Sequence, residues 1–351
     1  MLGFSMYLHD EIDASQEQIL KTYATAGFKG VFTSVNLPED DPSLLLAHLQ
    51  QLGQLCAQYG LALTVDVSAA ALTRLGLQLA DLSAFQQRHV TTLRMDDGIN
   101  MSDIAALTQT FHIALNASTI TVADIQALTA NHANFDHLEA WHNYYPRENT
   151  GLDRDWFKQK NHWLVDHGFT VMAFVAGDGE RRGPVFVGLP TLEAHRYLHP
   201  LAAMLDMQQL DVTHVFIGDP TLSSTTMEQL TQYTQAGVVV LHAQMQHWPD
   251  YFDRVLHQRA DVARDVIRLA EGRRLLEGHV LPEATTPRPI GAITLDNERA
   301  ARYEGELEIV KRELPADPTV NVIGQVVASD CDLLPFCSAN QAIKIMATKG
   351  V

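Results

Sequence analysis

Near its start the chain reads LGFSMYL (residues 2–8), SQEQILKTYATAG (15–27) and GVFTSV (30–35), and this succession decides the predicted fold. The first and third segments are short and apolar, as buried strands are, whereas the second has apolar residues at helical spacing. Ser15 is a suitable N-cap for that helix, and Gly27 suits the position just beyond its end. A strand, a helix and another strand in this order indicate a βα unit of a parallel sheet.

The same alternation continues through the greater part of the sequence. DPSLLLAHLQQLGQLCAQYG (41–60) is a second helix candidate, with Pro42 in its first turn and Gly60 at its end. Eight strand candidates with helix candidates between them match a (β/α)8 TIM barrel better than an open sheet. GVVVLHA (237–243) is a ninth strand candidate that would close or extend the sheet. The other six strand candidates span 61–67, 90–96, 112–118, 137–143, 169–177 and 212–218.

Beyond residue 245 the pattern changes. YFDRVLHQRADVARDVIRLAEGR (251–273) has the spacing of a long amphipathic helix, and LPEATTPRPIGA (281–292) is a proline-rich connector. Short β-like runs follow at 292–297, 305–314 and 321–328. We therefore predict an α/β protein with two domains. They are a TIM-barrel catalytic domain over 1–243, and a linker helix with a small β-rich C-terminal domain over 244–351.

Composition and charge narrow the class of protein. Of the 351 residues, 46% are hydrophobic and 19% are charged, which is typical of a folded globular chain. The formal net charge of −17 disfavours nucleic acid and anionic membranes as partners, because both bind basic surfaces. Neither a secretory signal nor a membrane span is predicted, and Cys56, Cys331 and Cys337 lack CxxC or metal-ligand spacing. We expect a cytoplasmic protein, for which the sequence permits a homodimer.

Catalytic groups of TIM barrels lie where strands end and in the loops that follow. Four aspartates occupy such places, although any one of them is more often a helix N-cap; they are Asp66, Asp96, Asp178 and Asp219. No GxGxxG or P-loop motif follows the first strand candidate, and the 16 histidines form no HxH or HExxH pattern near strand ends. We therefore expect neither a cofactor nor a metal.

The segment after the sixth strand candidate is denser in functional groups than a connecting loop requires. It reads HNYYPR (142–147) and combines proton-transfer, hydrogen-bonding, aromatic and cationic side chains. Glu139 lies inside the strand itself, where desolvation would raise its pKa and suit it to be a general acid. Two structural alternatives stay open: Glu139 paired with a basic neighbour in the barrel wall, and His142 as a packed strand-end histidine.

The loop after the seventh strand candidate is long and rich in glycine, as lids and binding loops are. Arg182, beside Gly183, has the fork geometry that clamps a carboxylate or a phosphate. Farther along we expect a helix that begins at Thr191, with His195 and Arg196 on its surface.

Three motifs together resemble one bacterial family: HNYYPRENTGL (142–152), RGPVFVGLPTLEAHR (182–196) and IGDP (217–220). The likeness extends along nearly the whole chain, and includes GFSMYL (3–8), LRMDDG (93–98), LNAST (115–119), ITLDNERAARYEGELEI (293–309) and NVIGQV (321–326). The sequence is similar to the bacterial 6-phospho-N-acetylmuramidases, formerly described as a domain of unknown function or as outer surface proteins.

This resemblance implies a TIM barrel followed by a small cyclophilin-like β domain. It also implies hydrolysis of the glycosidic bond in 6-phospho-N-acetylmuramyl-N-acetylglucosamine, a cytoplasmic step of peptidoglycan recycling. Two positions depart from the family pattern: Trp141, where a smaller residue is usual, and Val187, where an acid is frequent. The matching positions that we assign to substrate binding are Asn143, Tyr145, Arg147, Thr150, Arg182, Gly183, His195 and Arg196.

The implied substrate, a phosphorylated amino-sugar disaccharide, carries a phosphate and a lactyl carboxylate. Its site therefore needs at least two anion-binding groups and two catalytic carboxyls. We predict Arg147, Arg182 and Arg196 for the anions, with Glu139 as the general acid and Asp96 as its partner. The remaining candidates are His142, to orient or protonate the substrate, and Asp66, Asp178 and Asp219 in reserve. The alternatives are another phosphosugar-acting TIM-barrel enzyme, or a non-catalytic sugar-phosphate binding protein.

Overall fold

The chain consists of two compact units, Met1–Ser224 and Thr225–Val351. The computed structural model describes residues 1–9, 11–36, 42–78, 83–96, 98–245 and 252–348.

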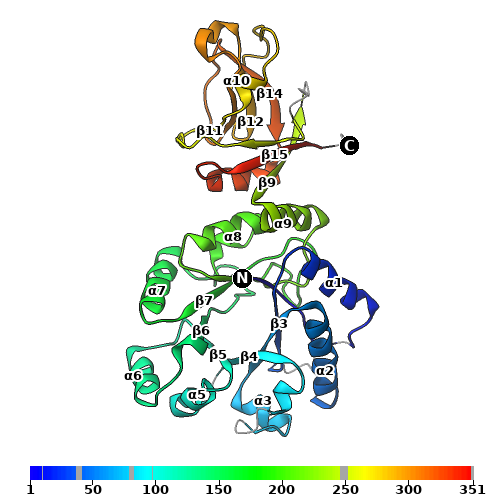
Figure 1. The fold of residues 1–351 in the computed structure, drawn as a ribbon, viewed down its shortest axis with the longest axis vertical. Helices are drawn as coiled ribbons and strands as arrows, with labels where there is room; N and C mark the ends of the chain where they lie inside the picture. Colours follow the sequence, from blue (N-terminus) through cyan, green and yellow to red (C-terminus); the bar gives the residue numbers. More distant parts are fainter. Residues whose placement is uncertain (10, 37–41, 79–82, 97, 246–251, 349–351) are drawn as a thin grey trace. The chain divides into compact units, whose positions relative to one another are not determined.

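The first unit is a closed barrel of eight parallel strands in sequence order (Figure 1). It closes where β1 pairs with β8, so the predicted TIM barrel is confirmed. Each strand lies within the segment predicted for it, because short apolar runs between turn residues leave little freedom for placing a buried strand. The strands are β1 Leu2–Ser5, β2 Gly30–Ser34, β3 Ala62–Val67, β4 Val90–Met95, β5 His112–Asn116, β6 Leu138–Trp141, β7 Thr170–Val175 and β8 His214–Ile217.

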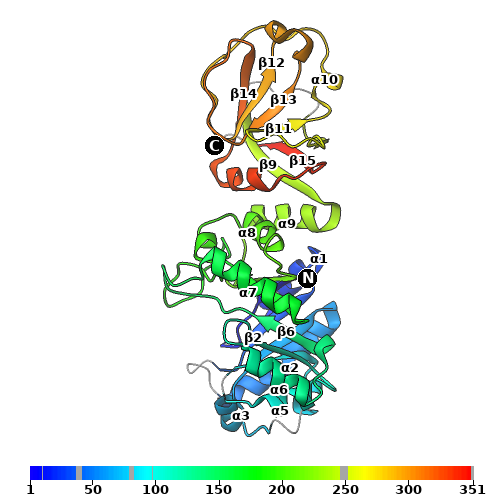
Figure 2. The ribbon, with the colours of Figure 1, turned by 90° about the vertical axis from the view of Figure 1, so that its left-hand side faces the viewer.

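Helices surround the strands of the barrel (Figures 1 and 2). The N-cap of the first helix is Asp13 rather than the predicted Ser15, since the Asp13 carboxylate accepts the backbone N–H groups of Ser15 and Gln16. Gly27 has the expected left-handed backbone just beyond that helix, with φ +96°. The α-helices of this unit are α1 Ala14–Thr25, α2 Pro42–Tyr59, α3 Ala69–Arg74, α4 Ser83–Gln86, α5 Met101–Leu107, α6 Val122–Ala130, α7 Arg154–Asp166 and α8 Pro200–Gln208, and its 3₁₀ helices are η1 Phe135–His137 and η2 Glu193–His195. Helix α9, Ser224–Ala236, begins at the last residue of this unit and belongs otherwise to the second.

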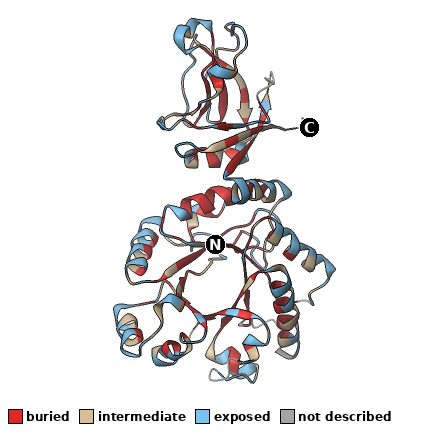
Figure 3. Cartoon of the chain, in the orientation of Figure 1, coloured by how far each residue is buried: buried red, intermediate tan, exposed pale blue. Residues whose placement is uncertain are grey.

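An aromatic layer fills the barrel interior. Its rings belong to Phe32, Trp141, Phe174 and Phe216, all buried and in contact with one another. The layer fits because Gly3 has no side chain: a Cβ there would lie 2.3 Å from the Phe216 ring. In Figure 3 the barrel strands are mostly buried, and the helices expose their outer faces. The bulky Trp141 is therefore part of the core of the barrel and not of its surface.

The second unit contains a seven-stranded mixed sheet in the order β10-β15-β9-β14-β12-β13-β11. Only the β15–β9 pair is parallel; the other pairs are antiparallel. This confirms a separate β-rich domain, while its cyclophilin-like character stays a prediction. The elements are β9 Val238–Met245, β10 Val255–His257, β11 Val266–Leu269, α10 Gly272–Leu275, β12 Ala292–Asp296, η3 Glu298–Tyr303, β13 Leu307–Val310, β14 Val320–Val326, η4 Ala328–Phe336 and β15 Ala342–Ala347.

Two expectations about this region differ from the structure. The ninth strand candidate does not extend the barrel: β9 pairs with β14 and β15 in the second sheet, so the expected division after residue 243 would cut a strand. The long helix predicted from residue 251 is wrong over the described residues, which form β10, β11 and the short α10 instead. Ile267 and Leu269 are buried on one face of β11 with Arg268 between them. Two short alternating runs joined by a turn imitate helical spacing.

A buried acid in the second unit makes its stability depend on pH. Burial, and then repulsion from Asp296 and Glu306, raises the pKa of Glu308 to about 7. A raised folded-state pKa stabilises the fold fully below the unfolded value of about 4.3, and this contribution is lost as the pH rises through 7. We expect Glu308→Gln to raise the free energy of unfolding at pH 8 by about 2–3 kcal/mol and to change it little at pH 4. Urea titrations at both pH values measure this, and an equal effect at the two would contradict it.

Candidate active site

A polar pocket opens where the barrel strands end. Asp66 and Arg94 lie near the C-terminal ends of β3 and β4, Asp96 lies just beyond β4, and Asn143 follows β6. This is the face at which TIM-barrel enzymes carry their catalytic groups. The pocket has a volume of about 170 Å³ and is lined by Phe32, Asp66, Arg94, Asp96, Asn143, Tyr144 and Phe174.

Arg94 organises one wall of this pocket. Its Nη1 donates to Asp66 Oδ1 at 2.5 Å, and its Nη2 donates to Asn143 Oδ1. The other oxygen of Asp66 accepts from Ser34 Oγ at 3.1 Å and Asn36 Nδ2 at 2.8 Å. The side chains of Arg94 and Asp66 are only 5% and 11% exposed, so the ion pair is largely shielded from water. Asn143, predicted to bind substrate, is brought beside the carboxylate of Asp66, which had been a reserve candidate.

Arg182 places a second cation near the pocket. Its Nη1 donates to Tyr144 Oη at 3.1 Å, and its guanidinium lies over the Tyr7 ring at 4.1 Å from the ring centre. Tyr7 in turn donates to the carbonyl of Gly218 at 2.9 Å. Burial raises the pKa of Tyr7 well above its ordinary value, so its hydroxyl remains a neutral donor. The predicted anion-binding role of Arg182 therefore fits its position.

Asp219 holds the loop that carries Arg182. Its carboxylate accepts the backbone N–H groups of Gly177 at 2.9 Å, Leu189 at 3.0 Å and Arg182 at 3.2 Å. The side chain is fully buried, and burial raises its pKa above the ordinary value of an aspartate. Asp219 is therefore a positioning residue for both ends of this loop.

Arg196 ties together the segments that follow β6 and β7. Its guanidinium makes five hydrogen bonds: two to the Glu193 carboxylate and one each to the carbonyls of Gly188, Tyr145 and Arg147. The Arg196 side chain is 1% exposed. It lies beyond a single turn of 3₁₀ helix, not on the surface helix that we predicted. With its donors used internally, Arg196 is a structural clamp rather than an anion-binding group.

His195 is also structural. Its Nε2 lies 2.9 Å from Asp206 Oδ2, its side chain is 1% exposed, and Asp206 also accepts from Arg154. This arrangement links η2 to α8 and differs from the predicted exposed, substrate-binding position. The helix expected from Thr191 onward does not form because Thr191 Oγ1 donates to the carbonyl of Asn143 and accepts from the N–H of Phe174, which ties it to the strand ends.

The other predicted binding residues lie along the rim, outside the pocket lining. Arg147 and Thr150 are exposed, and the hydroxyl of Thr150 donates to the Arg147 carbonyl at 2.6 Å. Tyr145 donates its backbone N–H to the Pro190 carbonyl. Gly183 is half-buried against the ring of Phe186, from which a Cβ would be 2.9 Å away.

His142 points away from the pocket into the layer between the barrel and α7. Its ring is fully buried, lies 4.6 Å from the Phe157 ring, and has Nε2 2.7 Å from Asn161 Oδ1. Burial lowers the pKa of His142 to about 4, so the ring is neutral at physiological pH. The structural alternative considered for this residue describes its place better than a role in proton transfer.

Glu139 lies at the opposite end of the barrel from the pocket. It is the second residue of β6, and its neighbours are His214, which begins β8, and the amino group of Met1. Trp141, in the aromatic layer, donates its Nε1–H to Glu139 at 2.6 Å. Burial acts to raise the pKa of Glu139, but hydrogen bonds from His214 and Trp141 outweigh it and leave the pKa below the ordinary value. The raised pKa expected for Glu139 from its desolvation is therefore absent.

We expect Glu139→Gln to retain kcat within about threefold of wild type, because residues at the N-terminal face of a TIM barrel serve stability. Steady-state hydrolysis of the disaccharide that the sequence resemblance implies measures this. A loss of about 100-fold, the size expected when a general acid is removed, would show that Glu139 takes part in catalysis.

Two general features of the described residues bear on function. No three His, Cys, Asp or Glu side chains among them converge as ligands of a metal ion would. None of the helices in that part of the chain is both long and apolar enough to cross a membrane.

Nearly the whole chain matches one protein family. Residues 2–232 match the N-terminal model of 6-phospho-N-acetylmuramidase, and residues 240–346 match its C-terminal model. The chain belongs to the 6-phospho-N-acetylmuramidase family. Membership makes it a glycosidase and confirms the resemblance identified from its motifs. No curated protein sequence matches the chain.

Two solved structures share this architecture. A conserved protein of unknown function from Enterococcus faecalis is 38% identical, with a TM-score of 0.92 over 99% of this chain and 97% of that one. An uncharacterized protein from B. cereus is 23% identical, with a TM-score of 0.77 over 98% and 99% of the two chains. The second likeness supports the fold alone.

Sequence reasoning placed Tyr7, Arg94 and Tyr144 at or just past strand ends but gave none of them a role in the site. What the sequence lacked was the pairing that brings them together: Arg94 with Asp66, and Arg182 with both tyrosines.

Proposed function

We propose that this glycosidase hydrolyses the bond between 6-phospho-N-acetylmuramic acid and N-acetylglucosamine, as a cytoplasmic step of peptidoglycan recycling. The observation that carries the proposal is the pocket at the barrel mouth, where two carboxyl groups, Asp66 and Asp96, lie with Arg94 in a chain of this family. Glycoside hydrolysis uses two carboxyl groups on either side of the scissile bond.

In the proposed reaction Asp96 donates a proton to the glycosidic oxygen as the bond to the anomeric carbon breaks. The electron pair of that bond stays on the leaving oxygen, which becomes a hydroxyl. Water supplies the hydroxyl of the anomeric carbon, and its remaining proton returns to the carboxyl pair. Asp66 suits the partner role because its ion pair with Arg94 and two further hydrogen bonds fix the position of its two oxygens. Asp96 and Asp66 thus replace the pair predicted from sequence, Glu139 and Asp96.

The anions of the substrate need cations outside this carboxyl pair. Arg182 is held over Tyr7 beside the pocket, and Arg147 is exposed on the rim. We propose these two for the phosphate and the lactyl carboxylate, by the fork geometry of a guanidinium. Arg196 is omitted because its hydrogen bonds are already made within the protein.

Incubation of the purified protein with the 6-phosphorylated disaccharide tests the proposal, with release of N-acetylglucosamine as the measurement. The matched control is the same disaccharide without phosphate. We expect it to be turned over at least about 100-fold more slowly, because the cationic side chains that would bind the phosphate are then left without a partner. Equal rates on both disaccharides would show that the protein does not require the phosphate. Turnover of only an unrelated phosphosugar would favour a different glycosidase activity of the same barrel.

A further inference from the structure

A second hollow lies next to the catalytic pocket, between the ends of β4 and β5 and the helices α5 and α6. We call it the crevice; it measures about 140 Å³. Asp96 lines both the pocket and the crevice, so the two hollows adjoin at this residue. The residues that line the crevice are Met95, Asp96, Gly98, Ile99, Met101, Ile104, Leu115, Asn116, Thr119, Ile120 and Asp124.

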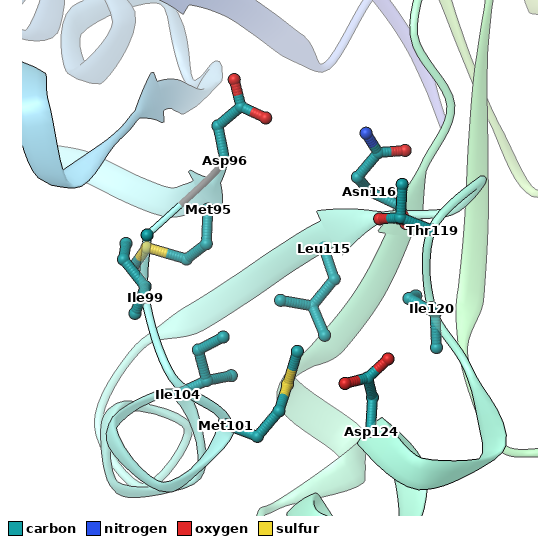
Figure 4. A pocket seen from close by; sticks show the side chains of 11 residues that line it. Met95, Asp96, Ile99, Met101, Ile104, Leu115, Asn116, Thr119, Ile120 and Asp124 are labelled. Carbon is teal, nitrogen blue, oxygen red and sulfur yellow. The ribbon is translucent and has the colours of Figure 1, made fainter.

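The crevice has an apolar floor, with the Asp124 carboxylate at one edge of it, and a polar mouth (Figure 4). In Figure 4 the carboxylate of Asp96 and the amide of Asn116 point to the same side, away from Met101 and Ile104. Ile104 is buried and Met101 is half-buried. Such a combination suits a ligand with apolar C–H or methyl surface below and hydroxyl or amide groups above.

The two hollows differ in charge. The pocket contains Arg94, and Tyr144 in its lining accepts a hydrogen bond from Arg182. The lining of the crevice includes neither lysine nor arginine among the described residues, and it includes two acids, Asp96 and Asp124. Asp124 already accepts from the N–H and hydroxyl of Thr121 as part of the α6 capping box. The pocket lining also contains two acids, Asp66 and Asp96, but it includes Arg94. Lys160 donates to the carbonyl of the crevice residue Ile120 at 2.6 Å and does not itself line the crevice. A phosphate or carboxylate is therefore less disfavoured in the pocket than in the crevice.

We infer that the crevice binds the uncharged leaving sugar, an N-acetylated amino sugar, while the anionic ring occupies the pocket. This inference rests on the proposed function and adds the orientation of the substrate. The acetamido methyl would lie on the apolar floor, and the scissile oxygen would lie at Asp96, where the two hollows meet. The position of Asp96 thus explains why it, rather than Asp66, supplies the proton to the leaving group.

Filling the mouth of the crevice tests this inference. Thr119 lines the crevice, is exposed, and lies in the turn after β5, so a larger side chain there need not disturb the core. We expect Thr119→Trp to raise KM for the phosphorylated disaccharide at least about tenfold and to raise the inhibition constant of free N-acetylglucosamine similarly. Thr110→Trp, on an exposed turn residue outside the crevice, is the matched control and keeps both constants near wild type.

A second substrate separates this inference from the proposed function. The glycosyl fluoride of 6-phospho-N-acetylmuramic acid has no leaving sugar, so Thr119→Trp is expected to hydrolyse it with the kcat/KM of wild type. Equal losses on the fluoride and the disaccharide would overturn the inference while leaving the activity in place. A wild-type protein inactive on both substrates would instead overturn the proposed function.

Ile99→Trp gives an independent check from the other side of the crevice, because Ile99 is also half-exposed there. The same split between the two substrates is expected. If both tryptophan variants bind free N-acetylglucosamine as wild type does, the leaving sugar does not occupy the crevice.

Discussion

Asp96→Asn lowers kcat on the phosphorylated disaccharide by about 100- to 10,000-fold, the range expected when a general acid is lost. An amide has the shape of the carboxyl group but cannot give up a proton to the glycosidic oxygen. The glycosyl fluoride needs little protonation of its leaving group, so its hydrolysis falls far less. Steady-state kinetics on the two substrates measure the difference, which a merely structural role of Asp96 would not produce.

The control for this substitution is Asp155→Asn, which removes an exposed carboxylate in the first turn of α7, outside the pocket lining. It leaves both rates near wild type. Equal losses on disaccharide and fluoride in Asp96→Asn would instead assign Asp96 to the step that both substrates share, attack at the anomeric carbon.

Arg196→Met destabilises the barrel unit by about 3 kcal/mol, the lower end of the range for breaking a buried ion pair. The lower end applies because the Glu193 side chain is 31% exposed and keeps some solvation. The carbonyls of Gly188, Tyr145 and Arg147 lose their common donor at the same time. Thermal unfolding measures the effect, with a fall in Tm of roughly 6–12 °C for a unit of this size.

Two further variants sharpen this result. Arg196→Lys recovers only part of the loss, because an ammonium group cannot make the same planar set of hydrogen bonds. Arg181→Met, on the same loop and with a cation–π contact to Tyr197, costs less than about 1 kcal/mol. A melting temperature of Arg196→Met equal to that of Arg181→Met would show that the clamp does not stabilise the fold.

The clamp also predicts sensitivity to acid. Hydrogen bonds from Arg196, assisted by the N–H groups of Asn149 and Gly151, lower the pKa of Glu193 to about 2. A lowered folded-state pKa stabilises the fold above the unfolded value of about 4.3, and this contribution is lost as the pH falls toward 2. The barrel unit thus loses stability as the pH falls below about 4.3. In that range the stabilising contribution of protonated Glu308 to the second unit is already complete.

The barrel could be predicted from sequence because its signal is local. Each strand is a short apolar run, and turn residues such as Gly27 and Gly60 mark where helices end. The β-rich second domain was predicted in outline for the same reason. Strands β10 and β11 of this domain were mistaken for a helix. They have only three and four residues, too few to distinguish the spacing of a strand from that of a helix.

The site was only partly predictable, because the roles of its residues depend on contacts between distant segments. The segments after β6 and β7 follow strand ends, as predicted, and their role in substrate binding stays a prediction. Within them, sequence could not show that His142 faces α7 or that Arg196 is enclosed by three backbone carbonyls. Nor could it show that Glu139 faces the other end of the barrel, since strand position alone does not fix which groups surround a side chain.

The Arg196 clamp has a consequence for how this family can diversify. Three of its five hydrogen bonds end on backbone carbonyls, which every amino acid provides, so the residues at positions 145 and 147 can change without loss of the clamp. Gly188 is restricted instead by its own backbone, which has a φ of +87°. Val185 and Phe186, at the exposed part of the same loop, are free of such a constraint on their side chains. We expect related enzymes to differ most between residues 184 and 187. New substrate preferences can evolve there while the Arg196 clamp is retained.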